Sequence, residues 1–514
     1  MSRVEALRAL IKEHECDAYL ITDSDGHYTF YSLSEEDRRL NWITECQAQC
    51  GLAIVTLNNK AFFQVPPNYR FLAKVEVNTD VWTLGDDIVQ WINNQQLSLK
   101  RIAYDPRLTP LFIIEQFSAL ASSLYPIHSS NNWIDIISKK ETSSEPSKLT
   151  PIWPLDEFRF AGQTSIEKDL QYEIRPYESF FAFLSTLKDQ DVWLDERTSV
   201  IVLHHLSSTG VVRISRSPIQ QMKEIKNSVE LEGFRQCHFR DCAAVCQTFE
   251  WLQKSMENDA LNVTELDVAK YLESRQREQV DFISIAFDTI SASATNTALI
   301  EYSPFARKTK TLIARDLFYL DGGGNYLDGT TDMTRTLHFG QATQEQIQCY
   351  TLALKAILFI EMTGFPCDDT LTGCYIHSLL RAQFASINNS NEHISFGHGV
   401  SHGMGVVEGG IFISDSPSLA TSTPIRPGMV IAIEPGIYFE GKWGIRLENV
   451  YEVIEDDQRF IHFIPLTLLP YSRPLIDVNL LSSEELKWIN VYHQRCLQYV
   501  DGGTWMKQEI DLFL

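Results

Sequence analysis

The stretch that decides the fold is LFYLDGGGNYLDGTTDMTRT, Leu317 to Thr336, in which an apolar segment ends in an aspartate, passes three glycines and reaches a second aspartate. Glycines permit a tight turn and return, which would set the carboxylates of Asp321 and Asp332 beside each other. Either aspartate taken alone is typical of a turn. Whether the pair forms a site therefore depends on the side chains that other segments bring beside it.

Three downstream segments supply candidate partners for the two aspartates. FGHGVSHGMG holds His398 and His402 among glycines, and MVIAIEPGIYF ends an apolar strand at Glu434. In GIRLENVYEV the period-two alternation of a strand puts Arg446 and Glu448 on one face. Four carboxylates and one imidazole are thus predicted to converge.

Such a cluster is unfavourable without cations, because buried carboxylates repel one another and shift toward protonation. Two divalent ions would neutralise it and could activate water. Oxygen-rich ligation with a single histidine favours Mn²⁺, Co²⁺ or Zn²⁺, and the spacing does not choose among them.

Composition limits the classes of protein that fit the chain. Its 514 residues carry a formal charge of -23, which argues against nucleic acid and anionic membranes as partners. The ten cysteines show no disulfide-scaffold pattern, and no apolar run is long enough to span a membrane. We therefore expect a cytoplasmic protein without membrane segments.

The chain reads as an α/β (α+β) protein of three parts. Residues 1–140 alternate strand and helix signals, and a polar linker follows. Residues 151–216 form a reduced middle module with the strand candidates DVWLD and SVIVLHHL, and residues 217–514 form the third part. A long helix is predicted to start after Asn227, with Glu230 completing a capping box.

The five positions Asp321, Asp332, His402, Glu434 and Glu448, in the contexts quoted above, resemble the metal centre of the pita-bread metallopeptidases of family M24. More narrowly, the chain is similar to the long cytosolic Xaa-Pro aminopeptidases, the aminopeptidases P. The likeness extends through residues 23–44, 225–238 and 465–493, and it covers most of the chain. It implies a creatinase-like α/β domain at residues 1–140 and a pita-bread catalytic domain at residues 217–514.

The resemblance also implies roles for single residues. Asp321 would chelate one metal ion, Asp332 and Glu448 would bridge both ions, and His402 and Glu434 would complete the second site. The catalytic set would be Glu434, His398, Arg446 and Tyr438. In that set Glu434 is the general base, His398 binds substrate, and Tyr438 and Arg446 line or support the pocket.

Three features depart from the family pattern. Glu301, in TALIEYSP, stands where the family has a histidine, so an ionised side chain there would accept rather than donate a hydrogen bond. The third active-site histidine has no counterpart, and Val407 falls nearest to its place. The middle module is also shorter than the family's second α/β domain.

The sequence thus predicts a dinuclear aminopeptidase that hydrolyses the N-terminal Xaa-Pro bond of short peptides. The resemblance implies two divalent ions per chain, as Mn²⁺, and a homodimer. Two alternatives stay open because of the departures. One is a catalytically reduced pita-bread protein that binds peptides or protein partners, and the other is a metal hydrolase with an altered substrate.

Overall fold

The computed structural model forms two compact units, and of the described residues those up to Pro218 belong to one and those from Ile219 on belong to the other. The structure describes residues 2–24, 37–48, 50–57, 61–118, 120–121, 123–127, 132–138, 179–187, 190–206, 210–257, 262–305, 309–313, 315–387, 398–406, 408–415 and 419–511. Each unit has its own apolar core. The division into three domains stays a prediction.

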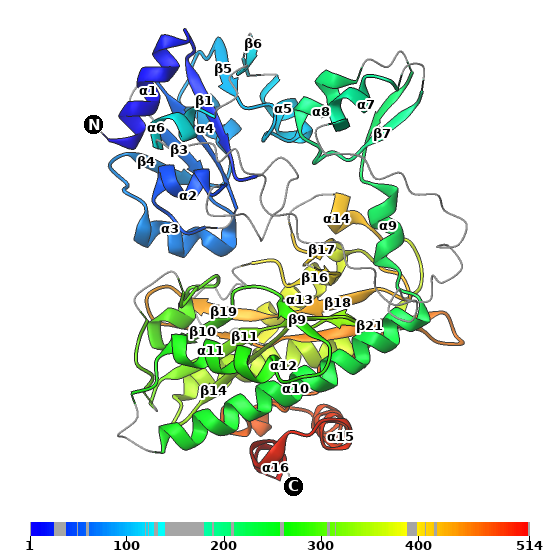
Figure 1. The fold of residues 1–514 in the computed structure, drawn as a ribbon. Helices are drawn as coiled ribbons and strands as arrows, with labels where there is room; N and C mark the ends of the chain where they lie inside the picture. The colour runs from blue at the N-terminus through cyan, green and yellow to red at the C-terminus, as the bar shows by residue number, and fades with distance from the viewer. Residues whose placement is uncertain are drawn as a thin grey trace. The chain divides into compact units, whose positions relative to one another are not determined.

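The first unit is built on a six-stranded mixed sheet in the order β4-β3-β2-β1-β5-β6 (Figure 1). Its strands are β1 Ala18–Thr22, β2 Leu52–Thr56, β3 Ala61–Gln64, β4 Trp82–Gly85, β5 Arg101–Tyr104 and β6 Ser123–Pro126. Its helices are α1 Arg3–Glu13, α2 Arg39–Thr44, η1 Pro67–Tyr69, α3 Arg70–Glu76, α4 Ile88–Asn94, α5 Leu111–Ser118 and α6 Trp133–Ser138.

Both faces of this sheet are apolar. Along β1, Tyr19 and Ile21 belong to one buried cluster and Leu20 belongs to another. Successive side chains of a strand point to opposite faces, so a strand that is buried throughout needs a layer of helices on each side. This arrangement confirms the α/β prediction for the first part of the chain.

A smaller group of elements completes the first unit: α7 Phe180–Leu184, β7 Val192–Leu194, α8 Val200–His205 and β8 Val212–Ile214. The prediction of a strand at DVWLD is confirmed by β7, but the prediction at SVIVLHHL is wrong, because that segment forms α8. Its apolar run carries no helix-breaking residue, and a short run of β-branched residues does not distinguish a buried strand from a buried helix. Leu184, Leu194 and Val200 share one buried cluster with Ile54 of the main sheet, so these elements have no separate core.

The second unit combines a six-stranded sheet and three smaller sheets with long helices. Its larger sheet has the order β15-β22-β21-β18-β16-β17, and a three-stranded sheet has the order β10-β11-β14. Strands β13-β12-β9 and β19-β20 form two smaller sheets. The strands are β9 Phe282–Ile285, β10 Ile290–Ser293, β11 Leu317–Gly322, β12 Gly324–Tyr326, β13 Gly329–Thr330, β14 Met333–His338, β15 Phe365–Pro366, β16 Ser401–Met404, β17 Glu408–Ile413, β18 Val430–Ile433, β19 Gly436–Phe439, β20 Trp443–Arg446, β21 Asn449–Glu455 and β22 Phe460–Pro465.

The helices of the second unit border these sheets (Figure 1). They are α9 Pro218–Glu224, which begins at the boundary between the units, α10 Ser228–Met256, α11 Glu265–Gln276, η4 Ala294–Ala298, α12 Gln344–Met362, α13 Gly373–Ile387, α14 Leu419–Ser422, η5 Arg473–Leu475, η6 Val478–Leu480, α15 Ser483–Tyr499 and α16 Gly503–Asp511. The longest, α10, contacts α11 and α16. The capping box predicted at its start is confirmed, because Asn227 accepts from the backbone N–H of Glu230, whose carboxylate accepts from the N–H of Asn227.

The glycines of the stretch from Leu317 to Thr336 let two segments approach each other closely. Strand β11 pairs with β14, so that Asp321 lies opposite Thr334. A Cβ atom added at Gly323 would overlap the carbonyl oxygen of Thr331. Only glycine therefore lets the end of β11 lie against the residues that lead into Asp332.

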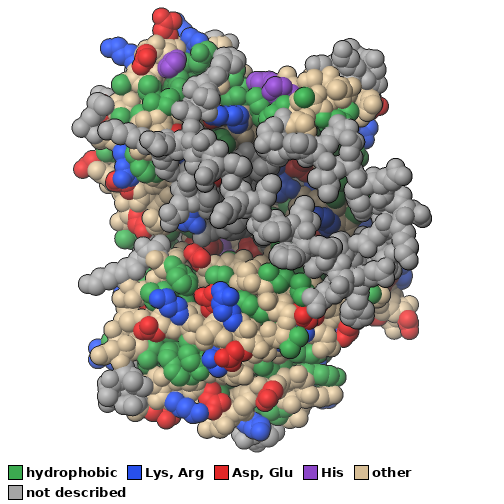
Figure 2. Space-filling view, viewed as in Figure 1, with side chains coloured by type: hydrophobic (Ala, Val, Ile, Leu, Met, Phe, Trp, Pro, Cys, Tyr) green, Lys and Arg blue, Asp and Glu red, His purple; other side chains and the backbone are tan. Residues whose placement is uncertain are grey.

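On the face shown in Figure 2, acidic and basic side chains are interspersed across the described surface. Among the described residues, no helix is both long and apolar enough to cross a membrane. The ten cysteines are free thiols, and Cys242 and Cys246 on α10 are fully buried.

Candidate metal centre

The five predicted ligand residues lie in strands of the second unit or directly beside them. Asp321 is in β11, and Asp332 comes immediately before β14. His402 is in β16, and Glu434 directly follows β18, the strand that pairs with β16. Glu448 lies in the break between β20 and β21, where its N–H donates to the carbonyl of Thr334. The two sheets thus present these side chains to a common place.

The carboxylates of Asp321, Asp332 and Glu448 form one side of the cluster. One oxygen from each lies within 4.8 Å of the others. All three residues are buried. Three carboxylate oxygens at this spacing match the ligands that hard divalent ions prefer.

His402 forms the other side of the cluster. Its Nδ1 faces the carbonyl oxygen of Gly403 at 3.3 Å, so the proton of a neutral ring lies on Nδ1 and the lone pair on Nε2. This Nε2 lies 3.5 Å from Asp332 Oδ2 and 3.9 Å from Glu434 Oε1. Burial lowers the pKa of His402 despite the neighbouring carboxylates, which favours the neutral, ligating form of the ring.

Burial also dominates the titration of the carboxylates. It raises the pKa of Asp321, and together with the like charges of the cluster it raises the pKa of Asp332 and Glu434 well above their ordinary values. Burial and the charge of Asp321 raise the pKa of Glu448 to about 7. These shifts measure the free energy needed to ionise the cluster without a cation, and a bound cation would remove that penalty.

Three further predicted residues form a chain of hydrogen bonds beside the cluster. Arg446 donates to Asp321 Oδ2 at 2.5 Å and, through Nη1, to the hydroxyl of Tyr438 at 3.0 Å and the carbonyl of Ile300 at 3.1 Å. His398 Nε2 lies 3.0 Å from the same hydroxyl.

The tautomer of His398 follows from these contacts. Its Nδ1 faces the carbonyl of Gly399 and carries the proton, so Nε2 accepts from Tyr438. Burial, with the charge of Arg446, lowers the pKa of His398 to about 3 and keeps the ring neutral. The order of donors is therefore fixed from Arg446 through Tyr438 to His398.

An unpartnered atom shows that this donor set fits cations. Asp321 Oδ1 is buried and accepts no hydrogen bond within the described structure, although Oδ2 is held by Arg446. A buried carboxylate oxygen without a donor is unfavourable unless a cation contacts it. With His402 Nε2 and the other carboxylate oxygens close by, the residues fit two divalent ions.

The structure also shows two residues that the sequence reasoning did not select. Thr334 donates to Glu448 Oε2 at 2.9 Å, and its position two residues after Asp332 in a strand could have indicated a shared face. Glu408 brings a carboxylate to within 3.8 Å of His402 Nε2.

Val407, expected nearest to the missing histidine, lies outside the described residues. Burial lowers the pKa of His402, and Glu301 is close enough for the charge of its carboxylate to oppose part of that shift.

Sequence comparisons agree with this architecture. Residues 232–455 match the model of "Metallopeptidase family M24", and residues 459–509 match its C-terminal region. Residues 3–137 match a "Creatinase/Prolidase N-terminal domain", and residues 155–230 match a second model with that description. The second match covers most of the expected middle module.

Individual relatives cover nearly the whole chain. A "Probable Xaa-Pro aminopeptidase P" of Aspergillus fumigatus is 30% identical over 96% of this chain and 88% of its own length. "Xaa-Pro aminopeptidase 1" of Dictyostelium discoideum is 27% identical over 96% and 92%. The crystal structure of X-prolyl aminopeptidase from Caenorhabditis elegans, described as a cytosolic enzyme with a di-nuclear active site, has a TM-score of 0.84 at 23% identity and covers 99% of both chains. The present chain belongs to metallopeptidase family M24. Within that family, it is similar to the Xaa-Pro aminopeptidases.

Proposed function

We propose that this protein is a dinuclear metallo-aminopeptidase that removes the first residue of short peptides with proline at position two. The observation that carries the proposal is the convergence of Asp321, Asp332 and Glu448 on one side with His402 and Glu434 on the other. Its relatives named Xaa-Pro aminopeptidase support the choice of substrate.

The five residues divide between the ions as the family resemblance implies. Asp321 would bind one ion, Asp332 and Glu448 would bind both, and His402 and Glu434 would bind the second. When bound, the two ions supply activation of water and polarisation of the scissile carbonyl group.

Side chains of the protein accept the proton and hold the other groups of the site in position. Glu434 is the proposed general base, as the family resemblance implies, because its carboxylate directly follows β18 and lies 3.9 Å from His402 Nε2 within the cluster. Arg446 fixes Asp321 and also fixes the hydroxyl of Tyr438, which donates to His398. His398 is held as a neutral ring beside Glu434, 4.0 Å from Nδ1 to Oε2, where it can contact the substrate.

The bond before proline suits such a centre. That peptide bond carries no N–H, so a protease that recognises its substrate through this N–H cannot use it. Activation by a metal centre acts on the carbonyl side of the bond and does not need that donor. The requirement for a free N-terminus follows if the same centre also holds the α-amine in place.

Four finer assignments belong to the same proposal. We assign Mn²⁺ to both sites, because oxygen-rich ligation with one histidine suits it. A homodimer is assigned from the family resemblance. A cytosolic location is supported by ten free cysteines and by the cytosolic relative of similar fold. The domains are residues 1–140, 151–216 and 217–514.

The test is release of the first residue from an Xaa-Pro-Pro peptide by chelator-treated protein reconstituted with Mn²⁺. Asp332→Ala is the control, because it removes a bridging ligand. We expect turnover by the native protein and a fall of more than about 100-fold in the variant, since loss of a mere supporting contact to a metal ligand already lowers activity about 10–100-fold. No turnover despite two bound ions would refute the proposal and favour an altered substrate or a peptide-binding role.

A further inference from the structure

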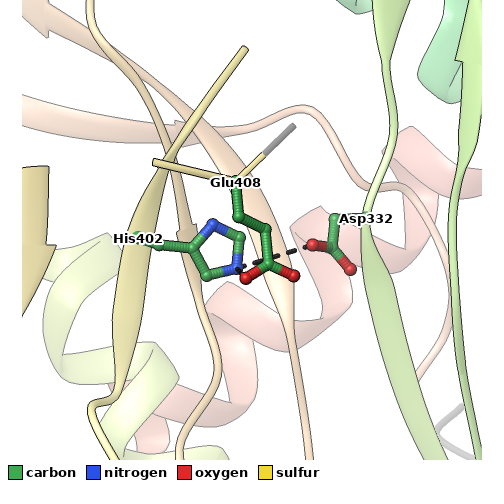
Figure 3. A group of neighbouring side chains, drawn as sticks. All are labelled: Asp332, His402 and Glu408. Carbon is green, nitrogen blue, oxygen red and sulfur yellow. Dashed lines mark ion pairs between the residues drawn. The ribbon is translucent and has the colours of Figure 1, made fainter. Parts of the chain in front are cut away.

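A fifth carboxylate lies on the His402 side of the cluster. Glu408 is the first residue of β17, and its Oε2 lies 3.8 Å from His402 Nε2. One oxygen of Glu408, one oxygen of Asp332 and a ring nitrogen of His402 all lie within 4.8 Å of one another. Figure 3 shows the side chains of His402 in β16, Glu408 in β17 and Asp332, just before β14, directed toward a common point. Glu408 is not among the residues that the family resemblance assigns.

An irregular hairpin brings Glu408 to this position. His402 pairs with Phe412, but Met404 pairs with Glu408, so β17 carries two more residues than β16 between these pairs. The extra length falls at a glycine pair, and Gly410 has φ +84°, in the left-handed region that favours glycine. Such a bulge redirects the neighbouring side chain.

Repulsion between like charges makes it unfavourable for the carboxylate of Glu408 to lie in this cluster without a cation. One oxygen of Glu408 lies within 4.8 Å of an oxygen of Asp332, so the two carboxylates repel each other when both are ionised. Arg446 supplies a permanent positive charge to the cluster, and its ion pair is with Asp321. A further carboxylate beside His402 and Asp332 is stabilised there when a cation lies between them.

A second observation points to the same occupant. Asp321 Oδ1 is buried and accepts no hydrogen bond within the described structure. Asp321 forms a second group of candidate ligands with Asp332 and Glu448, and Asp332 is common to this group and to the group with His402 and Glu408.

We propose that Glu408 is a ligand of the ion that Asp332 and His402 bind. This inference rests on the proposed function, because it requires that the cluster hold metal ions. Arg446 and two divalent ions then supply five positive charges. These balance the five negative charges on the ionised carboxylates of Asp321, Asp332, Glu408, Glu434 and Glu448. The ion on the His402 side then has five protein ligands: Asp332, His402, Glu408, Glu434 and Glu448. Five ligands suit the six-coordinate preference of Mn²⁺ better than the four-coordinate preference of Zn²⁺.

The test measures metal binding rather than turnover. Chelator-treated native protein, Glu408→Gln and Glu408→Ala are titrated with Mn²⁺ and with Zn²⁺ by calorimetry. The matched control is Glu345→Gln, which changes an exposed glutamate in the first turn of α12. We expect two Mn²⁺ ions in the native protein and in the control. In both Glu408 variants, one of the two Mn²⁺ ions should bind at least about tenfold more weakly, with a smaller loss for Zn²⁺.

Thermal unfolding separates ligation from a structural role. A ligand held among like charges destabilises the metal-free protein, so Glu408→Gln should leave the metal-free Tm unchanged or raise it and should reduce the gain in Tm on adding Mn²⁺. A fall in the metal-free Tm with an unchanged metal-induced gain would show a structural role and overturn the inference.

The remaining outcomes distinguish this inference from the proposed function. Native protein that binds no Mn²⁺ overturns both. Native protein that binds two Mn²⁺ ions, with Glu408 variants of unchanged affinity, overturns the role of Glu408 alone. Unchanged metal affinity with a raised KM for peptides that have a free N-terminus would make Glu408 an amine-binding residue, and would also overturn it.

Discussion

Replacing Thr334 with valine tests whether a single hydroxyl sets the affinity of the cluster for cations. Thr334 is fully buried in β14, and its hydroxyl donates to Glu448 Oε2 at 2.9 Å. The hydroxyl lowers the pKa of both Glu448 and Asp321, so it stabilises their ionised forms, which bind cations. Valine keeps the branched shape and removes the donor.

The structure sets the size of the expected effect. A hydrogen bond to a charged group contributes about 1.5–3 kcal/mol. Loss of a partner that orients a metal ligand lowers metal affinity about 10–100-fold, or about 1.4–2.8 kcal/mol. Burial raises the pKa of Glu448 to about 7, so at pH 8 this carboxyl is mostly ionised and the bond is to a charged group. We expect Mn²⁺ affinity to fall about 10–100-fold, and the unfolding free energy of the metal-free protein at pH 8 to fall by about 1.5 kcal/mol.

Calorimetric titration with Mn²⁺ and urea unfolding of the metal-free protein measure the two quantities. The matched control is Thr248→Val, because Thr248 is equally buried but its hydroxyl donates to the carbonyl of Ala244 within α10. This control should keep the native Mn²⁺ affinity. If folded Thr334→Val bound Mn²⁺ within about twofold of native affinity, a difference of less than about 0.5 kcal/mol, the reasoning would be refuted.

Three other predictions concern single side chains. Tyr438→Phe removes the hydroxyl between Arg446 and His398 and should lower kcat on the order of 10²-fold while Mn²⁺ affinity is kept; an unchanged kcat would contradict this. Glu301→His supplies a donor in place of an acceptor and should leave peptidase turnover equal or raise it; complete loss of turnover in folded protein would count against the idea. Burial raises the pKa of Glu509 to about 7, so the folded state holds a proton that the unfolded state releases, and stability should fall as pH rises from about 4.3 to 7. Glu509→Gln should flatten this fall, with a gain of up to about 3 kcal/mol above pH 7 in urea unfolding; equal pH profiles would refute it.

The departures from the family pattern acquire a different meaning in the structure. The missing histidine suggested a lost donor, and Glu301 suggested a misplaced acceptor. The irregular hairpin of β16 and β17 instead places the carboxylate of Glu408 beside His402. Under the proposal that Glu408 is a metal ligand, the centre has changed its composition rather than simply lost a part, which is why metal affinity and metal preference are the properties to measure first.

The sequence by itself determined the features that depend on local patterns. The capping box of Asn227, the short apolar run of β1 and the strand that ends just before Glu434 are each set by neighbours a few residues apart. The ligand residues could be named because their sequence contexts resemble the metal centre of the pita-bread metallopeptidases. The segment that became α8 was misassigned for the same reason, because its apolar run fits a buried helix as well as a strand.

Only the tertiary structure decided which side chains of different segments meet. The bond from Thr334 to Glu448 joins residues 114 positions apart, and no local period encodes it. Glu408 reaches His402 through a bulge whose register follows from the pairing of β16 with both β17 and β18. The physical reason is that a cluster of like charges has no local stability, so its members take their places only when the packing of two sheets fixes their backbones around a shared point.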